Sequence, residues 1–161
     1  MAHIIKKYKM HFLLDFHYSD YWADPGQQNK PDAWKNLSFD ELKEAVHKYT
    51  YDVLYRLKIM DCAPDMVQIG NEIRSGMLFP DGAVPQYRQL AALVNEGIRA
   101  VRELLPETKV MIHLDQGGRY NCIMPWFDSM FNAGMLPIDA IGLSFYSFWH
   151  GTFMDLKDTM S

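Results

Sequence analysis

Four short apolar runs recur along the chain, and longer segments with a different periodicity separate them. The runs cover residues 11–16, 66–70, 110–114 and 138–143. None of them alternates cleanly between apolar and polar positions, which is typical of strands buried in a parallel sheet. The pattern therefore predicts four parallel strands.

The segments between these runs have the spacing of amphipathic helices. Within 39–58 and 86–105, apolar residues recur at steps of three and four: Leu42, Val46, Tyr49, Val53 and Leu57, then Leu90, Leu93, Ile98, Val101 and Leu105. Ser38 followed by Glu41 is a capping-box signature, and Pro106 closes the second segment. A shorter helix is expected at 126–131, and the first ten residues are interpreted as the end of another helix.

This order of helices and strands predicts an α/β fold with about four parallel βα units in a single domain over residues 1–161. The segments that follow strands (17–37, 71–85, 115–122 and 144–151) are long and rich in polar and aromatic residues, whereas those leading from helix to strand are short. A closed eight-stranded barrel needs about 250 residues, so the chain holds about half of one. A flat doubly wound sheet stays open as an alternative, although no glycine-rich phosphate loop supports it.

Composition narrows the classes of partner. The 161 residues carry 16 Lys and Arg against 20 Asp and Glu, a formal net charge of −4, which argues against a nucleic acid partner. No apolar stretch approaches the ~20 residues of a membrane span, and the first residues lack the apolar region of a secretory signal. Cys62 and Cys122 are too few for a disulfide framework. The 4 Trp, 9 Tyr and 9 Phe are unusual because many lie in polar segments.

Candidate chemistry gathers at the ends of the predicted strands. Asn71 and Glu72 directly follow the second strand, where a carboxyl group can serve as a general acid and an amide can hold a hydroxyl. The same pair can also be an ordinary turn. The other strands end in residues that suit sugar binding, with aromatic rings for stacking and polar groups for hydroxyls: His17, Asp20, Trp22, His113, Asp115, Tyr146 and Trp149. Taken singly, His113 can be a core histidine, Tyr146 can cap the sheet, and Trp126 and Phe127 suit a helix core.

The segments 13–26, 64–73, 76–82, 113–115 and 141–151 together resemble glycoside hydrolase family 53, the endo-β-1,4-galactanases. The resemblance implies a partial (β/α)8 TIM barrel and retaining hydrolysis of β-1,4-galactosidic bonds in galactan and type I arabinogalactan. It makes Glu72 the acid/base at the end of the fourth barrel strand, with Asn71 holding the sugar 2-hydroxyl. Tyr146 matches a tyrosine near the nucleophile. The remaining matches surround the substrate cleft: His17, Asp20, Trp22, His113, Asp115 and Trp149. No cofactor or metal is implied.

One departure from the family pattern limits the expected activity. If Glu72 ends strand four, the chain carries strands three to six, whereas the family nucleophile ends strand seven and no glutamate follows Glu107 here. A retaining glycosidase needs two carboxylates, so this chain alone is expected to be inactive. Asp115 is a weaker alternative for the second carboxylate.

The alternative function is a half-barrel that binds galactan or associates with itself. The strands at Phe12 and Ile141 would leave open edges, through which two copies could close an eight-stranded ring. For the parent enzyme the resemblance implies an extracellular or periplasmic location, since galactan lies outside the cell.

Overall fold

The computed structural model describes all residues from 1 to 161, and strands alternate with helices along most of the chain. The strands of the main sheet are β1 (Leu13–Phe16), β2 (Met66–Ile69), β5 (Lys109–Leu114) and β6 (Ala140–Leu143). The helices are α1 (Ala2–Lys7), α2 (Phe39–Ile59), α3 (Tyr87–Leu104), α4 (Tyr120–Asn132), α5 (Ser147–His150) and α6 (Phe153–Met160). Short 3-10 turns, η1 (Asp32–Trp34) and η2 (Ile73–Ser75), lie in the loops after β1 and β2. The four predicted strands are confirmed, although β1 and β6 begin two residues later than expected.

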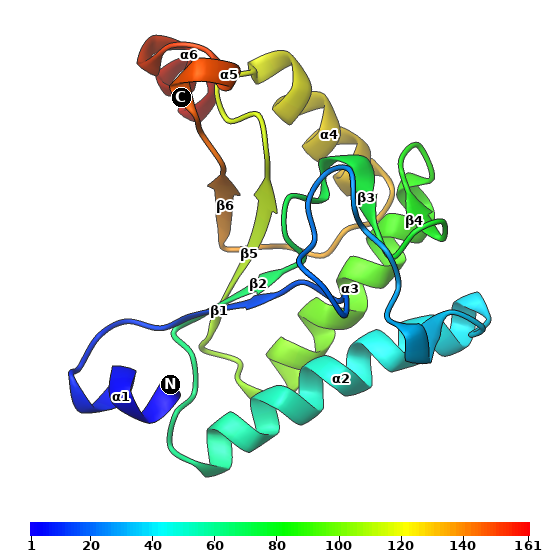
Figure 1. Ribbon diagram of the computed structural model, residues 1–161, viewed down its shortest axis with the longest axis vertical. Coiled ribbons are helices and arrows are strands. Elements are labelled where there is room, and N and C mark those ends of the chain that lie inside the picture. The colour runs from blue at the N-terminus through cyan, green and yellow to red at the C-terminus, as the bar shows by residue number, and fades with distance from the viewer.

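The four strands form one parallel sheet in the order β1-β2-β5-β6. Asp15 pairs with Gln68, Gln68 with Met111, and His113 with Gly142, so these residues share one face of the sheet. The strand direction turns steadily from β1 to β6, and α2 and α3 lie side by side along one side of the sheet (Figure 1). Curved parallel strands with an outer layer of helices make a partial (β/α)8 barrel, as predicted.

The strand residues that alternate with these point to the opposite face of the sheet, where they form the apolar core together with the helices. Val67, Ile69, Val110, Ile112 and Leu114 are fully buried and belong to one apolar cluster. That cluster also contains apolar residues of the helices, namely Leu42, Val46, Leu54, Leu90, Leu93, Val94, Ile98, Val101, Ile123, Trp126, Phe127 and Met130. Trp126 and Phe127 are thus helix core. The other sheet face, with Asp15, Met111 and His113, is only partly covered.

Helix α2 begins at the predicted cap, with both hydrogen bonds of the Ser38–Glu41 capping box in place. Its buried stripe differs from the predicted one, because Thr50 and Leu54 continue from Leu42 and Val46 where Tyr49 and Leu57 were expected. Thr50 is buried without an unpaired hydroxyl, since its Oγ1 donates to the Val46 carbonyl and contacts Tyr18 Oη at 2.7 Å. Tyr49, 47% exposed, packs its ring edge-on against Phe16.

Two further segments differ from the sequence-based expectation. Helix α4 begins at Tyr120, six residues before the predicted start, and contains Pro125 within it. The loop after β2 contains a small antiparallel hairpin of β3 (Gly76–Met77) and β4 (Gly82–Ala83), which strands of only two residues made hard to predict. None of the helices combines the length and hydrophobicity needed to cross a lipid bilayer.

Candidate active site

The backbone turns through left-handed conformations just after three of the four strands. Tyr18 after β1, Glu72 after β2 and Gln116 after β5 have φ angles of 52°, 50° and 65°. Non-glycine residues adopt such angles at a cost, and they concentrate where a side chain must be aimed in a particular direction. Gly70, at φ 78°, makes the first of these turns after β2. The turns direct the side chains at the carboxyl ends of the strands.

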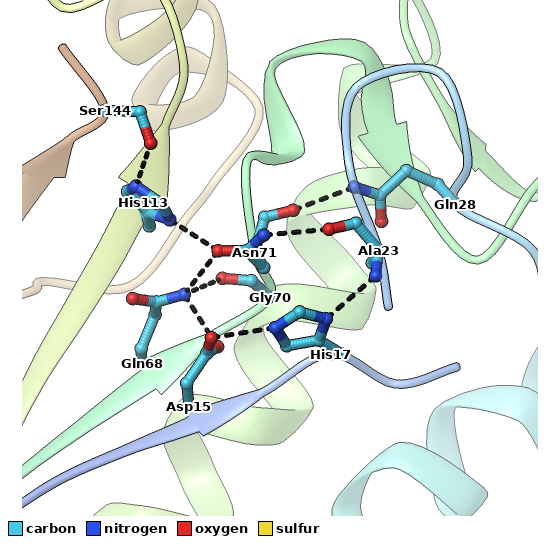
Figure 2. A network of polar contacts seen from close by, with 9 residues as sticks. All are labelled: Asp15, His17, Ala23, Gln28, Gln68, Gly70, Asn71, His113 and Ser144. Atoms are coloured by element: carbon cyan, nitrogen blue, oxygen red, sulfur yellow. Dashed lines mark hydrogen bonds and ion pairs between the residues drawn. The ribbon is translucent and has the colours of Figure 1, made fainter. Parts of the chain in front are cut away.

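Asn71 lies at the centre of the resulting network of polar contacts (Figure 2). Its Oδ1 is 2.7 Å from His113 Nδ1 and accepts from Gln68 Nε2 at 3.2 Å. Its Nδ2 donates to the carbonyl of Ala23 at 2.8 Å, and its own carbonyl accepts from Gln28 Nε2 at 2.8 Å. The Asn71 side chain is thereby tied to its own strand β2, to β5 and to the loop after β1.

His17 connects the loop after β1 to the strand below it. The backbone N–H of Ala23 donates to His17 Nδ1 at 2.8 Å, and His17 Nε2 contacts Asp15 Oδ2 at 2.9 Å. Burial raises the pKa of Asp15, while the charge and hydrogen bond of His17 oppose that shift. His17 therefore holds the loop that supplies the Ala23 carbonyl to Asn71.

His113 closes the network on the side of β5 and β6. Its second ring nitrogen, Nε2, lies 3.0 Å from Ser144 Oγ at the end of β6. Burial lowers the pKa of His113 below its ordinary value of 6.5, and the negative charges of Glu72 and Asp15 act in the opposite direction. His113 is thus a polar member of the site rather than a core residue.

The network also contains residues that the sequence did not single out, namely Asp15, Ala23, Gln28, Gln68 and Ser144, and Gln68 is the most central of them. It lies in the middle of β2, is only 4% exposed, and donates through Nε2 to Asp15 Oδ1 at 2.6 Å and to the Gly70 carbonyl at 3.0 Å. The available signal was a glutamine inside an otherwise apolar strand, because a buried polar side chain needs partners.

Glu72 follows Asn71 and is partly exposed, and its side chain makes no capping hydrogen bond to η2. Its negative charge raises the pKa of His113, against the larger effect of burial, and contributes to the raised pKa of Arg74. A carboxyl group that is partly covered and not committed to a protein donor can exchange a proton with a bound molecule.

Arg74 and Asp115 form a second polar contact at this end of the sheet. Arg74 Nε and Nη2 donate to the two carboxylate oxygens of Asp115 at 2.8 and 3.1 Å. Asp115 is 5% exposed, and its hydrogen bonds and, to a smaller extent, its charge raise the pKa of Arg74. The pair joins the loop after β2 to the end of β5. Both Asp115 oxygens accept hydrogen bonds from Arg74. The predicted contact of Asp115 with substrate stays a prediction, as does its weaker alternative role as the second carboxylate.

The other predicted residues lie outside the network. Trp22, Tyr146 and Trp149 are 72%, 54% and 68% exposed, and the rings of the last two are 5.6 Å apart. Asp20 accepts a hydrogen bond from the backbone N–H of Asp32. A cavity of about 720 Å³ lies at the opposite end of the strands, lined by residues such as Phe12, Asp65 and Lys109, so the polar network is not in this hollow. The structure brings together Asn71, His17 and His113, and Glu72 directly follows Asn71 in the chain.

Known proteins resemble this chain both in sequence and in structure. The sequence model of Glycosyl hydrolase family 53 matches residues 1–161. A Niallia circulans protein described as "Uncharacterized protein in bgaB 5'region" is 48% identical over 99% of this chain and 46% of its own length. An arabinogalactan endo-beta-1,4-galactanase of Thermothelomyces thermophilus is 36% identical over 84% of this chain and 42% of its own.

Among solved structures, the Ignisphaera aggregans GH53 catalytic domain superposes with a TM-score of 0.94 at 43% identity. That match covers 98% of this chain and 43% of the solved one. The chain thus spans a little under half the length of these relatives.

Proposed function

The chain belongs to glycosyl hydrolase family 53, and from that membership we propose that it carries the acid/base part of an endo-β-1,4-galactanase active site. The substrate would be a β-1,4-linked galactan or type I arabinogalactan. The observation that carries the proposal is the position of Glu72, partly exposed directly after an Asn71 side chain that three segments of the chain hold in place. The parent enzyme would act outside the cell or in the periplasm, where such polymers are found.

In the proposed reaction Glu72 acts twice. It first donates a proton to the glycosidic oxygen as the bond breaks, and it then removes a proton from the water that releases the product with retention. Such general acid–base catalysis contributes about 10²–10⁴ to a rate. Asn71 would hold the 2-hydroxyl of the sugar at the cleaved bond, which positions the reacting carbon.

Sugar rings would be held by the exposed side chains around the network. The faces of Trp22 and Trp149 offer stacking surfaces for the C–H face of a pyranose. Asp20 would bind hydroxyls, Tyr146 would lie near the nucleophile, and Asp115 would contribute to the substrate site together with Arg74. His17 and His113 would line the sugar site, since both ring nitrogens of each are engaged within the network.

A retaining reaction also needs a nucleophilic carboxylate ~5–5.5 Å from the acid/base. In the family arrangement this group follows a later strand, and no glutamate follows Glu107 in these 161 residues. We therefore expect the 161-residue chain to bind galactan oligosaccharides without hydrolysing them.

The experiment measures both activities on the same protein. Galactan oligosaccharides are titrated against the chain while tryptophan fluorescence is followed, and reducing ends are measured after incubation with galactan. A saturable fluorescence change without release of reducing ends is expected, and Glu72→Gln should bind equally well. Release of reducing ends that Glu72→Gln does not reduce would remove Glu72 from its proposed role, and absence of binding would contradict the proposal as a whole.

A second candidate function is an assembly module in which two copies associate. Strands β1 and β6 form the two edges of the sheet, and Leu13 on β1 and Ile141 on β6 are about half exposed. Pairing of β6 with β1 of a second copy would preserve the parallel direction and close eight strands. Light scattering should then give twice the mass of one chain, whereas a stable monomer would exclude this candidate.

A further inference from the structure

His150 is a buried ionisable residue to which the proposed reaction gives no role. It is the last residue of α5, a single helical turn of four residues, and only 6% of it is exposed. Tyr146, which precedes the turn, and Trp149 within it are largely exposed. A buried polar side chain needs hydrogen-bond partners, and the partners of His150 indicate what it does.

We propose that His150 is a positioning residue that fixes the turn carrying Tyr146 and Trp149, with its ring nitrogen Nδ1 accepting the backbone N–H of Tyr146. The role of these two rings at a sugar site belongs to the proposed function above, and this part of the inference rests on it. The hydrogen bond itself can be tested without any sugar.

Tyr146 and His150 bind one another in both directions. The backbone N–H of His150 donates to the Tyr146 carbonyl at 2.8 Å, and the backbone N–H of Tyr146 donates to His150 Nδ1 at 3.1 Å. This pairing resembles a capping box, in which a side chain reaches back to the N–H of the residue that precedes the helix. The Tyr146 side chain makes no capping hydrogen bond, and a helix of one turn is not stable by itself. The His150 ring therefore supplies the cap of α5.

The position of the hydrogen on the His150 ring follows from the neighbours of Nδ1. This nitrogen also lies 3.0 Å from the Ser144 carbonyl, and it can either donate to that carbonyl or accept from Tyr146. The Ser144 carbonyl already accepts from the backbone N–H of Gly117 at 2.9 Å, whereas the Tyr146 N–H has no other partner. Accepting from Tyr146 leaves neither backbone group unpaired, and donating to Ser144 would leave one. The hydrogen of neutral His150 therefore belongs on Nε2, which is not buried without a partner.

The His150 ring also supports the exposed rings by direct packing. Its centroid is 5.5 Å from that of Tyr146, with the ring planes at 70°, and the Tyr146 and Trp149 rings are 5.6 Å apart at 64°. Both contacts have the edge-to-face geometry that aromatic rings favour. The three rings thus form a chain of contacts from buried His150 to exposed Trp149.

The loop after β5 holds the other end of the turn. A Cβ at Gly118 would overlap the His150 carbonyl, so the loop packs directly against that carbonyl. Arg119 Nη2 donates to the Trp149 carbonyl at 3.2 Å. Both residues lie just before α4, next to α5 (Figure 1). These contacts act on carbonyls at the end of the turn, whereas the N–H at its beginning is bound by His150 alone.

Nitrogen-15 NMR of the unmodified chain tests the hydrogen bond directly. At pH 8, where neutral imidazole dominates, His150 should carry its hydrogen on Nε2. A scalar coupling between the Tyr146 amide nitrogen and His150 Nδ1 should be detected across the N–H···N bond. A hydrogen on His150 Nδ1, or absence of this coupling, would overturn the proposal. The measurement needs neither a variant nor a ligand.

His150→Asn and His150→Leu are a matched pair of variants. Both remove the imidazole ring and have nearly the same shape, but asparagine Oδ1 can accept the Tyr146 N–H in place of Nδ1, whereas leucine has no acceptor. His150→Leu should weaken binding of galactan oligosaccharides about tenfold or more relative to the unmodified chain. His150→Asn should bind within about threefold of the unmodified chain. Tryptophan fluorescence measures the binding.

The outcomes separate the role of His150 from the proposed function. Equal weakening of binding by the two folded variants would overturn the proposal, because it would assign the whole effect to the lost ring. Unchanged binding by His150→Leu would overturn it as well. If neither variant folds, the hydrogen position and the coupling in the unmodified chain decide the question. If the unmodified chain binds no oligosaccharide, the proposed function fails, and the same NMR measurement still decides whether His150 holds the turn.

Discussion

The two faces of the four-stranded sheet serve different purposes, although the same strands build both. On β5, Val110, Ile112 and Leu114 are fully buried against the helices, whereas Met111 and His113 between them are partly exposed on the other face. Side chains of adjacent strand residues point to opposite faces. The strand residues that face the helices therefore stabilise the fold, and the alternate residues, which face the other way, contribute to the polar network.

The two faces also satisfy their buried groups in different ways. The helix-covered face is apolar and needs only close contacts, whereas the network face holds Gln68 and Asp15 and needs a donor for every acceptor. A change on the first face removes contact area, and a change on the second leaves a polar group unpaired. Four substitutions or conditions test this difference, from the largest expected effect on stability to the smallest.

The largest effect is expected for Ile112→Ala on the helix-covered face. This change leaves a cavity in the apolar cluster and should lower the free energy of unfolding by about 2–5 kcal/mol in a urea titration. Met111→Ala, one position away on the other face, is the control and should cost less because Met111 is only partly buried. Equal losses for the two variants would contradict the division between the faces.

Asn71→Ala should have the next largest effect. It leaves the N–H groups of His113 and Gln68 without their shared acceptor, which should cost about 1–3 kcal/mol of unfolding free energy. Binding of galactan oligosaccharides should be lost as well. The exposed Asn121→Ala is the control, and it should stay within about 0.5 kcal/mol.

The pH dependence of stability should report the burial of His113. Its folded pKa lies below 6.5, so the unfolded chain binds the proton more readily and stability falls as the pH drops below about 6.5. Urea midpoints between pH 8 and pH 5 measure this slope. His113→Gln, which cannot titrate, should flatten it, and an unchanged slope would show that His113 is not the source.

Trp149→Ala should have the smallest effect on stability, within about 0.5 kcal/mol, because the side chain is largely exposed. Oligosaccharide binding should nevertheless weaken roughly two- to tenfold, as expected for loss of a stacking surface. Phe148→Ala, a neighbouring aromatic residue that is 93% exposed and has no proposed contact, is the control. Equal binding by both variants would remove Trp149 from the proposed sugar site.

Much of the fold could be predicted from local features of the chain. The apolar runs located the strands to within a few residues, and the Ser38–Glu41 cap located the start of α2, because these signals depend only on neighbouring residues. The same reasoning did not predict the buried face of α2. A buried helix face that contains Tyr49 and one that contains Thr50 both fit the helical spacing. The contact of Thr50 with Tyr18, 32 positions away in the chain, is what places Thr50 on the buried face.

Some residues of the site could also be predicted from the sequence, and others could not. Asn71, Glu72 and His17 follow strands and His113 lies near the end of β5, and parallel strands bring their carboxyl ends to one edge of the sheet. The role of Gln68 and the pairing of Arg74 with Asp115 were not predictable, because they depend on partners 53 and 41 positions away.

The sequence by itself thus determined which segments form strands and helices and which residue types gather at one end of the sheet. The tertiary structure alone decided the direction of each hydrogen bond among them. The physical reason is that a donor and an acceptor meet only when the register between strands sets their separation, and register is a property of paired strands, not of either strand alone.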